Sequence, residues 1–191
     1  MLVVRALHRS AAVDDDRREF ALLGKRENSG LVLARPVVTG VRSRAVLELR
    51  QNHARARFTA LVGGEFAPGE GDRLDWRVRF WETVRPAPRQ GLLRGALLPG
   101  LPERLDHAVT DGLRTYLDSG ALPAGRLVID RAGYGHESSP VLFPTAAELL
   151  LHILPAGAFG SPTEPILRSW VTTVRLPLAL PEIDHDPAGR P

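Results

Sequence analysis

Residues 57–80 read RFTALVGGEFAPGEGDRLDWRVRF, and no other stretch of the chain has so clear a pattern. The first part, 57–62, is almost wholly apolar after its arginine and predicts a strand. Pro68 opens a Pro-Gly-Glu-Gly-Asp run, which is typical of a turn. Over 76–80 an apolar or aromatic residue alternates with arginine, the period of two of a half-buried strand. The stretch therefore predicts an antiparallel hairpin.

The residues before this hairpin give weaker signals. Residues 45–49 are apolar enough to predict one more strand. Further upstream, 31–33 and 37–41 are strand-like segments that a proline separates, and 14–23 has the acidic start of a short helix. We therefore describe 1–41 as an N-terminal extension without a clear assignment.

The first helix predicted after the hairpin has the strongest helical spacing in the chain. Apolar residues from Leu105 to Leu117 recur every three or four positions and form one stripe. Pro102 precedes this stripe and Gly120 follows it, which is the usual arrangement of helix start and stop. Residues 126–130 then predict a short strand.

A second helix is predicted from its cap. Thr145 and Glu148 have the spacing of a capping box, so the helix is expected over 146–154, with a proline ending it. The preceding residues, 131–143, are rich in Gly, Ser and Pro and predict a loop. Beyond the helix, 170–176 are rich in β-branched residues and predict a strand, whereas the tail 181–191 is expected to be disordered. Two helices on one face of a mixed sheet make an α+β fold.

Composition excludes several classes of protein. No apolar run approaches the length of a membrane-spanning helix, and the N-terminus lacks the layout of a signal peptide, so we expect a cytoplasmic protein. The chain has no cysteine, which rules out disulfides, thiolate catalysis and zinc sites with cysteine ligands.

The charge is small overall but unevenly spread. The net charge is +3, and all basic residues except Lys25 are arginine. Residues 42–131 hold 15 arginines against 11 acidic residues, whereas 132–191 hold 3 against 6. A basic middle suits contact with phosphate, although a GC-rich genome explains the arginine bias equally well.

The order of these segments resembles domain IV of elongation factor G and of the tetracycline ribosomal protection proteins. Residues 58–76 are similar to the strand, Pro-Gly turn and strand of that family. Residues 101–125 (LPERLDHAVTDGLRTYLDSGALPAG) resemble its first helix, and 134–151 (YGHESSPVLFPTAAELLL) resemble its tip loop and second helix. Residues 127–130 and 162–175 continue the series.

The resemblance implies a fold of the ribosomal protein S5 domain 2-like type over 42–160. Residues 161–180 would then be the terminal strand segment that starts a domain V, whose remainder the sequence lacks. The chain also has no G-x-x-x-x-G-K-[ST] motif, so the phosphate-binding loop of a GTPase is missing.

The resemblance also implies a set of ribosome-binding residues. In the family, the tip of domain IV reaches the decoding region of the ribosome. The residues that match this tip are Tyr134, His136, Ser138, Ser139, Pro140 and Val141. Aromatic rings and hydroxyl groups of this kind can stack on unpaired bases and bond phosphate or 2′-OH groups. An exposed loop with no partner is the alternative.

Arginines near this tip are candidates for contacts with rRNA phosphates. Arg50, Arg55 and Arg57 come just before or at the start of the hairpin, and Arg131 follows the predicted strand 126–130. Arg85, Arg89 and Arg94 lie in the long loop before the first helix. Solvated surface arginines are the alternative for each of them.

No catalytic or metal site follows from the sequence. The six histidines are scattered, and Asp184-His185-Asp186 is better explained as part of an acidic tail than as a metal site. Ser138 and Ser139 lack the G-x-S-x-G elbow of a nucleophile. We therefore expect neither an enzyme nor a cofactor, although related folds host kinases and nucleases.

Two functions are consistent with these features. The first is a ribosome- or rRNA-binding protein that acts without its own GTPase, alone or with a GTPase partner encoded separately. The second is a diverged or truncated relative that serves as a protein-interaction scaffold with no ribosomal role. No membrane partner is expected, and the sequence does not indicate an oligomeric state.

Overall fold

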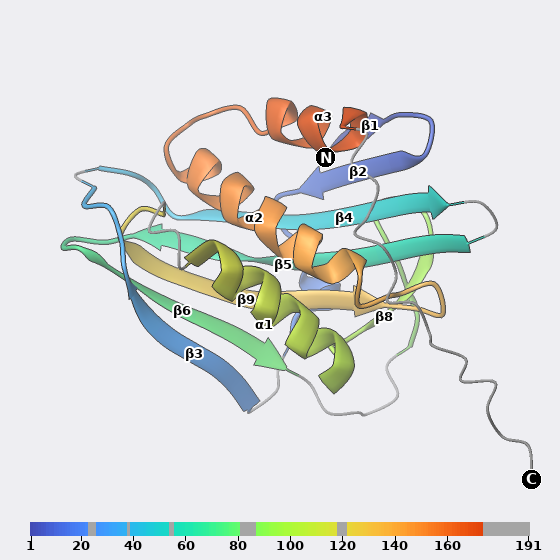
Figure 1. Ribbon diagram of the computed structural model, residues 1–191, viewed down its shortest axis with the longest axis horizontal. Helices are drawn as coiled ribbons and strands as arrows, with labels where there is room; N and C mark the ends of the chain where they lie inside the picture. The colour runs from blue at the N-terminus through green and yellow to red at the C-terminus, as the bar shows by residue number, and fades with distance from the viewer. Residues whose placement is uncertain (23–25, 38, 54–55, 81–86, 118–121, 174–191) are drawn as a thin grey trace, which may run out of the picture.

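The computed structural model describes residues 1–22, 26–37, 39–53, 56–80, 87–117 and 122–173, and one large curled sheet forms its centre (Figure 1). The strands lie side by side in the order β1-β2-β4-β5-β9-β6-β3, and every neighbouring pair is antiparallel except β6 and β9, which are parallel. Their bounds are β1 Leu2–Arg5, β2 Arg9–Asp14, β4 Ser43–His53, β5 Ala56–Pro68, β9 Gly125–Tyr134, β6 Arg73–Phe80 and β3 Arg26–Leu33.

The remaining elements cover the two faces of the sheet. The helices are α1 Glu103–Leu117, α2 Leu142–Ala158 and α3 Glu164–Thr172. Two short strands, β7 Arg89–Gln90 and β8 Ala96–Pro99, form a hairpin whose second strand pairs with the end of β9. The single turn of 3-10 helix, η1, runs over Arg18–Phe20. The mixed sheet with helices confirms the α+β class, whereas the finer S5 domain 2-like type remains a prediction.

The predicted hairpin over 57–80 is wrong in its pairing. Both strands and the turn between them exist, and Gly71 in that turn has a φ of +100°. However, β9 lies between β5 and β6 and pairs with both. The turn therefore joins strands that are two positions apart, about 10 Å, rather than neighbours. The hairpin of this region is β4–β5 instead, which pairs from Ser43–Phe66 to His53–Ala56.

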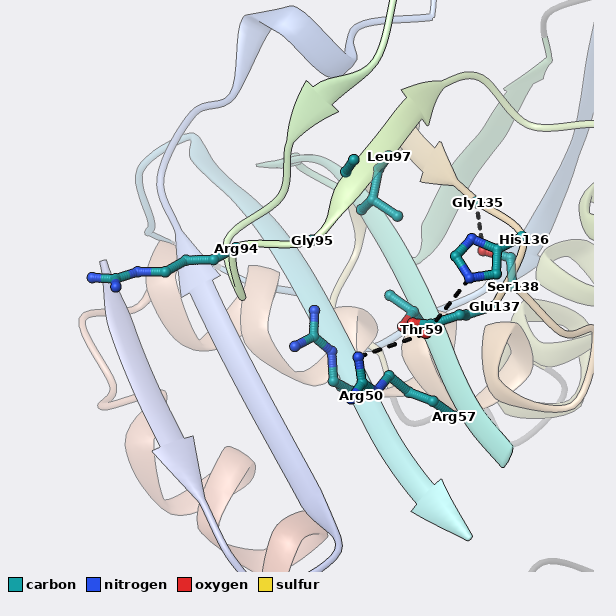
Figure 2. Close-up of a pocket in the computed structure, with 11 residues that line it drawn as sticks. Arg50, Arg57, Thr59, Arg94, Gly95, Leu97, Gly135, His136, Glu137 and Ser138 are labelled. Carbon is teal, nitrogen blue, oxygen red and sulfur yellow. Dashed lines mark hydrogen bonds and ion pairs between the residues drawn. The ribbon is translucent and has the colours of Figure 1, made fainter. Parts of the chain in front are cut away.

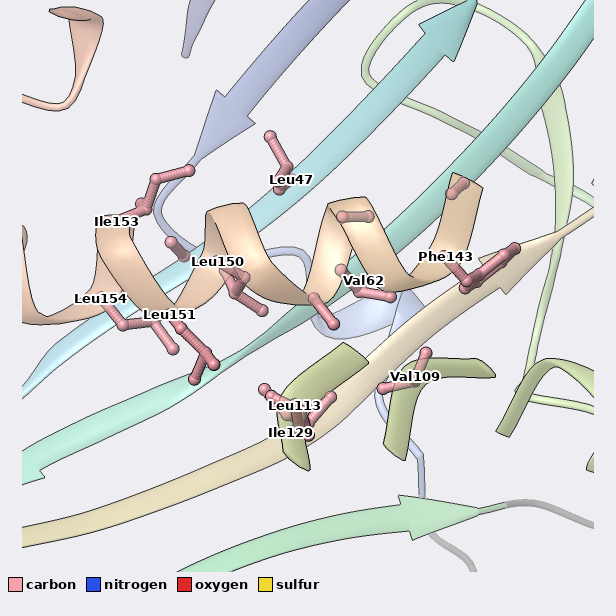
Figure 3. Packing of buried hydrophobic residues seen from close by; sticks show 14 of the residues in the cluster. Leu47, Val62, Val109, Leu113, Ile129, Phe143, Leu150, Leu151, Ile153 and Leu154 are labelled. Carbon is pink, nitrogen blue, oxygen red and sulfur yellow. The ribbon is translucent and has the colours of Figure 1, made fainter. Parts of the chain in front are cut away.

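The main core lies between the sheet and two helices on one of its faces (Figures 1 and 3). Val109 and Leu113 of α1 are fully buried there, as predicted from the helical spacing of 105–117, and so is Leu150 of α2. The sheet contributes Val62 and Ile129 from its central strands, both also fully buried. Burial of such side chains stabilises the fold by roughly 1.5–3 kcal/mol each.

A second, smaller core lies on the opposite face of the sheet. It consists of Ala12, Phe20, Val46, Leu61, Leu92, Leu93 and Leu97, which come from β2, η1, β4, β5 and the β7–β8 hairpin. Residues 1–22 are thus part of the same sheet and core, and β3 forms the strand at its far end. The described residues of 1–41 are therefore integral to the fold, and the helix expected over 14–23 is replaced, in the described residues 14–22, by the end of β2 and the turn η1.

The second predicted helix exists but begins earlier and ends later than its caps suggest. Helix α2 spans Leu142–Ala158, so Thr145 lies inside it and no side chain caps its start. Leu142 and Phe143 are buried, which favours the earlier start, and Pro144 is tolerated in a first turn. Pro155 lies in the last turn of the helix and does not end it, although a proline cannot donate the backbone hydrogen bond to the carbonyl of Leu151.

The strand predicted over 170–176 is wrong for the residues that the structure describes. Residues 170–172 belong to α3, and 174–176 lie outside the described part of the chain. Helix α3 buries Leu167 and Val171, which are four residues apart, and Arg168 pairs with Glu164 at 2.6 Å across one turn. These contacts outweigh the β-branched composition. The tail 181–191 also lies outside the described residues.

Candidate functional site

A pocket of about 290 Å³ opens on the face of the sheet that carries the smaller core (Figure 2). Three segments that are distant in sequence build it: the β4–β5 hairpin, the loop between β7 and β8, and the turn that follows β9. Its polar wall consists of Arg50, Arg57, Thr59, Arg94, His136, Glu137 and Ser138.

The register of β4 and β5 explains why two of the arginines meet. Arg50 lies opposite Thr59, and Asn52 lies opposite Arg57. Because side chains alternate between the faces of a sheet, Arg50, Arg57 and Thr59 all point to the same face. Only the antiparallel pairing of β4 with β5 brings Arg50 and Arg57 together.

The turn after β9 completes one side of the pocket. The amide of Thr59 donates to the carbonyl of Glu137 at 3.0 Å, which holds the turn alongside β5. The amide of Gly135 donates to Ser138 Oγ at 3.0 Å, and Ser138 is only 8% exposed. This hydroxyl therefore shapes the turn instead of facing a ligand.

Positive charge dominates the pocket. Glu137 is the one acidic residue that lines it among the described residues, and it lies 3.6 Å from Arg57 and 3.7 Å from His136. Arg50 lies 3.5 Å from a second carboxylate, that of Glu48, which is buried beneath the pocket. Arg94 is exposed and has no ion pair within the described ranges. Two compensated arginines and one uncompensated arginine favour an anionic ligand.

The residues predicted as one tip do not form one surface. His136 and Ser138 line the pocket, whereas Val141 lines a groove elsewhere on the molecule. Tyr134 is the last residue of β9 and packs against the main core, and Ser139 Oγ accepts a bond from the amide of Val141 at 3.4 Å. Pro140 is exposed but lines neither cavity.

The four predicted arginines also separate. Arg50 and Arg57 line the pocket, and Arg55 lies outside the described residues, as does Arg85. Arg131 was expected in a loop but lies inside β9 and is 5% exposed. Its guanidinium pairs with Asp130 and, at 2.9 Å, with Asp16, so it is not free to contact a phosphate.

Three features of the site were not predicted from the sequence, or were predicted only as one possibility among several. Arg94 was only one of several loop arginines, and its Gly-Leu-Leu-Arg-Gly context, 91–95, was its one distinguishing signal. Glu137 adjoins the predicted site residue His136, and an acidic residue next to a predicted site residue is a signal that the sequence does contain. The buried Glu48 has no such signal, because an isolated acidic residue within an apolar strand resembles an exposed one.

A larger groove of about 910 Å³ lies between α2, α3 and the end of the β4–β5 hairpin. Phe58, Val141, Leu149 and Trp170 make its walls largely apolar. Arg9 crosses one end, where its guanidinium donates to the carbonyls of Trp170 at 2.9 Å and Thr173 at 2.7 Å. This cation therefore binds the last turn of α3, as the helix dipole favours.

No protein-family model matches this chain, and no curated protein or solved structure proved significantly similar to it. The resemblance to domain IV of elongation factor G therefore remains a prediction. Within the described residues, no group of three His, Asp or Glu side chains is placed to hold a metal ion. Nor does that part of the chain contain a helix long and apolar enough to cross a membrane.

Proposed function

We propose that this chain binds RNA through the backbone phosphates that enter the arginine pocket, and that ribosomal RNA is its target. The observation that supports the proposal is that Arg50, Arg57 and Arg94, from two separate parts of the chain, all line one pocket, with the side chain of Arg94 extending outward from its edge (Figure 2). The ribosomal target rests only on the resemblance to domain IV of elongation factor G. The activity needs neither catalysis nor a cofactor.

Each part of the pocket has a role in such binding. Guanidinium groups bind phosphate oxygens with paired hydrogen bonds, and the exposed Arg94 at the edge of the pocket can bind a phosphate outside it. The side chain of His136 is 92% exposed at the rim, where its ring can stack on an unpaired base. Gly135 leaves room for close approach of a sugar-phosphate chain.

The direct test measures RNA affinity against salt. A fluorescently labelled single-stranded RNA is titrated with protein between 50 and 200 mM salt, and fluorescence anisotropy reports binding. With three phosphate contacts, log K against log salt should fall with a slope of about −2. Arg57→Gln and Arg94→Gln should each reduce that slope by about 0.7. Arg126→Gln changes an exposed arginine outside the pocket and serves as the matched control.

The ribosomal target has its own test. The protein should co-sediment with 30S or 70S particles at low salt, and less so at moderate salt, because counterion release weakens phosphate contacts. Arg57→Gln and Arg94→Gln should reduce the pelleted fraction. Absence of pelleting at low salt would exclude the ribosome while leaving binding to free RNA open.

A protein-interaction scaffold is the second candidate, and the apolar groove between α2 and α3 favours it. A photo-crosslinking residue at position 149, on the groove wall, should then capture a protein in cells. The same residue at position 126 is the control, because Arg126 lies away from the groove. Capture at 149 together with salt-independent, negligible RNA binding would favour the scaffold over the RNA-binding function.

A further inference from the structure

A buried carboxylate lies directly beneath the arginine pocket. Glu48 is in the middle of β4, opposite Leu61 and next to Ala12, and its side chain is 0% exposed. Leu92 and Leu93 of the β7–β8 loop cover it as part of the smaller core. A carboxylate in such apolar surroundings costs stability unless polar groups compensate it.

One oxygen of Glu48 binds the β7–β8 loop. The amide of Leu93 donates to Glu48 Oε2 at 2.9 Å. Gly91, at the start of the loop, comes so close that an added Cβ would lie 2.5 Å from the same oxygen. The loop is closed by a bond from the amide of Gly91 to the carbonyl of Gly95 at 2.8 Å. The loop is thus built directly onto this carboxylate.

The other oxygen faces Arg50. Arg50 Nη2 lies 3.5 Å from Glu48 Oε1, and the same nitrogen would lie 2.9 Å from a Cβ added at Gly95. Arg50 is therefore held between the carboxylate and the loop. Arg94 sits within that loop with a φ of +64°, a conformation that arginine adopts only where its surroundings impose it.

We propose that Glu48 is a positioning residue for the RNA-binding pocket: its ionised carboxylate holds both Arg50 and the loop that carries Arg94, and its protonation releases them and weakens binding. The inference rests on the proposed function, because it concerns the regulation of that same pocket. Glu48 itself contacts no ligand.

The charges around Glu48 set the pH range of this effect. Burial raises the pKa of Glu48, while the Leu93 amide and Arg50 oppose the rise. Arg17, just before η1, also faces it, donates to the carbonyl of Gln90 at 2.8 Å and is itself paired with Asp14 and Glu19. Protonation therefore begins above the ordinary range of a glutamate. A proton on His136 would add positive charge and strengthen binding, which is the opposite direction.

The first experiment follows RNA affinity against pH in a His136→Gln background, which removes the histidine contribution. The probe is the labelled single-stranded RNA used above, measured from pH 7.5 to 4.5. Affinity should fall about tenfold over this range, since protonation of Glu48 loosens the contacts that Arg50 and Arg94 make with RNA phosphates. Glu48→Gln keeps a carbonyl that can accept from Leu93 but cannot ionise. It should bind about tenfold more weakly at pH 7.5 and show no pH dependence.

Hydrogen exchange of the Leu93 amide, corrected for the intrinsic effect of pH, tests the loop without any RNA. Exchange should accelerate in mild acid and in Glu48→Gln, while the amide of Ile129 stays protected as an internal reference in β9. This readout separates the two proposals. If RNA never binds but Leu93 responds as expected, the RNA-binding function fails and the anchoring by Glu48 stands.

A second variant guards against misfolding of Glu48→Gln. Gly95→Ala displaces Arg50 from the loop side and leaves the carboxylate unchanged, so RNA affinity should fall several-fold while its pH dependence remains. Identical pH profiles of the Glu48→Gln variant and its His136→Gln parent, or Leu93 exchange that ignores both pH and the substitution, would overturn the proposal.

Discussion

Arg94 is the residue at which binding and stability are expected to conflict. Its φ of +64° is unfavourable for a residue with a Cβ, and glycine adopts it freely. Arg94→Gly should therefore raise the free energy of unfolding by about 0.5–1 kcal/mol, measured by urea denaturation, and weaken RNA binding. Arg94→Gln should weaken binding equally without the gain in stability, because it keeps the strained conformation. Equal stability of the two variants would argue against strain at this position.

Asp106 predicts a pH dependence of stability. It is 5% exposed at the start of α1, and burial raises its pKa from 3.8 to about 6, although Thr110 donates to it at 3.3 Å. The folded state therefore binds this proton more tightly than the unfolded state does. The contribution of Asp106 to stability is greatest below pH 4, declines between pH 4 and 6, and stays low above pH 6.

Asp106→Asn removes the buried charge and keeps an acceptor for Thr110. We expect it to stabilise the protein at pH 7 by at most about 3 kcal/mol, and by much less at pH 4. Urea denaturation at pH 4, 5, 6 and 7 checks this. The exposed Asp72→Asn, in the turn before β6, is the control and should have little effect at any of these pH values.

At the residue scale, the sequence identified exposed arginines better than buried ones. Arg50 and Arg57 were expected to bind phosphate, and the antiparallel register places both in the pocket. Arg131 has the same chemistry but is buried, because Asp16, far away in sequence, pairs with it. Nothing near Arg131 in the sequence indicates that partner. The burial of Glu48 under a distant loop is equally invisible.

At the scale of elements, the close contact of α1 with α2 predicts that one substitution to a better helix former will destabilise the protein. Gly112 is in the middle of α1, and a Cβ added there would lie 2.5 Å from Pro144 Cα in α2. Gly112→Ala should therefore destabilise the protein by about 1–3 kcal/mol, although alanine is the better helix former. Asp111→Ala, exposed on the same helix, is the control for propensity alone. Thermal denaturation that shows Gly112→Ala to be more stable would contradict this close approach.

The helices show which local signals are reliable. The regular apolar stripe of 105–117 predicted α1 closely, because a stripe of this width is both the cause of helix burial and visible in the sequence. The capping box at Thr145 misplaced the start of α2, since burial of Leu142 and Phe143 favours a helix that begins four residues earlier. For α3, the composition of 170–176 favoured a strand, whereas burial of Leu167 and Val171 favours a helix.

At the scale of the whole molecule, the strand order was beyond the reach of local patterns. The turn at 68–72 predicted a hairpin, which is the usual result when a short turn joins two strands. Here β9 pairs with both strands and separates them. Its near-continuous burial, from Leu127 to Gly133 except at Asp130, fits a strand in the centre of a sheet. Contacts across the whole sheet place β9 between β5 and β6, and no local sequence pattern records those contacts.

The last prediction concerns the N-terminal segment and tests whether the rest of the chain can fold without it. Residues 1–41 supply β1, β2 and β3, so they form the strands at both ends of the main sheet. Phe20 and Leu22 fill the cores on opposite faces. A chain that begins at Arg42 would expose the edges of β4 and β6 and leave both cores incomplete. Exposed edges of this kind promote aggregation.

We therefore expect residues 42–191 alone to lack a cooperative unfolding transition by circular dichroism and to aggregate in size-exclusion chromatography. In the full chain, Phe20→Ala should cost about 3–5 kcal/mol, because it empties the centre of the smaller core. Leu7→Ser is the matched control in the same segment: Leu7 is 93% exposed between β1 and β2, and its loss should change stability by less than about 0.5 kcal/mol. Cooperative folding of 42–191 with unchanged stability would mean that β4 and β6 can end the sheet, and that β1, β2 and β3 are an extension after all.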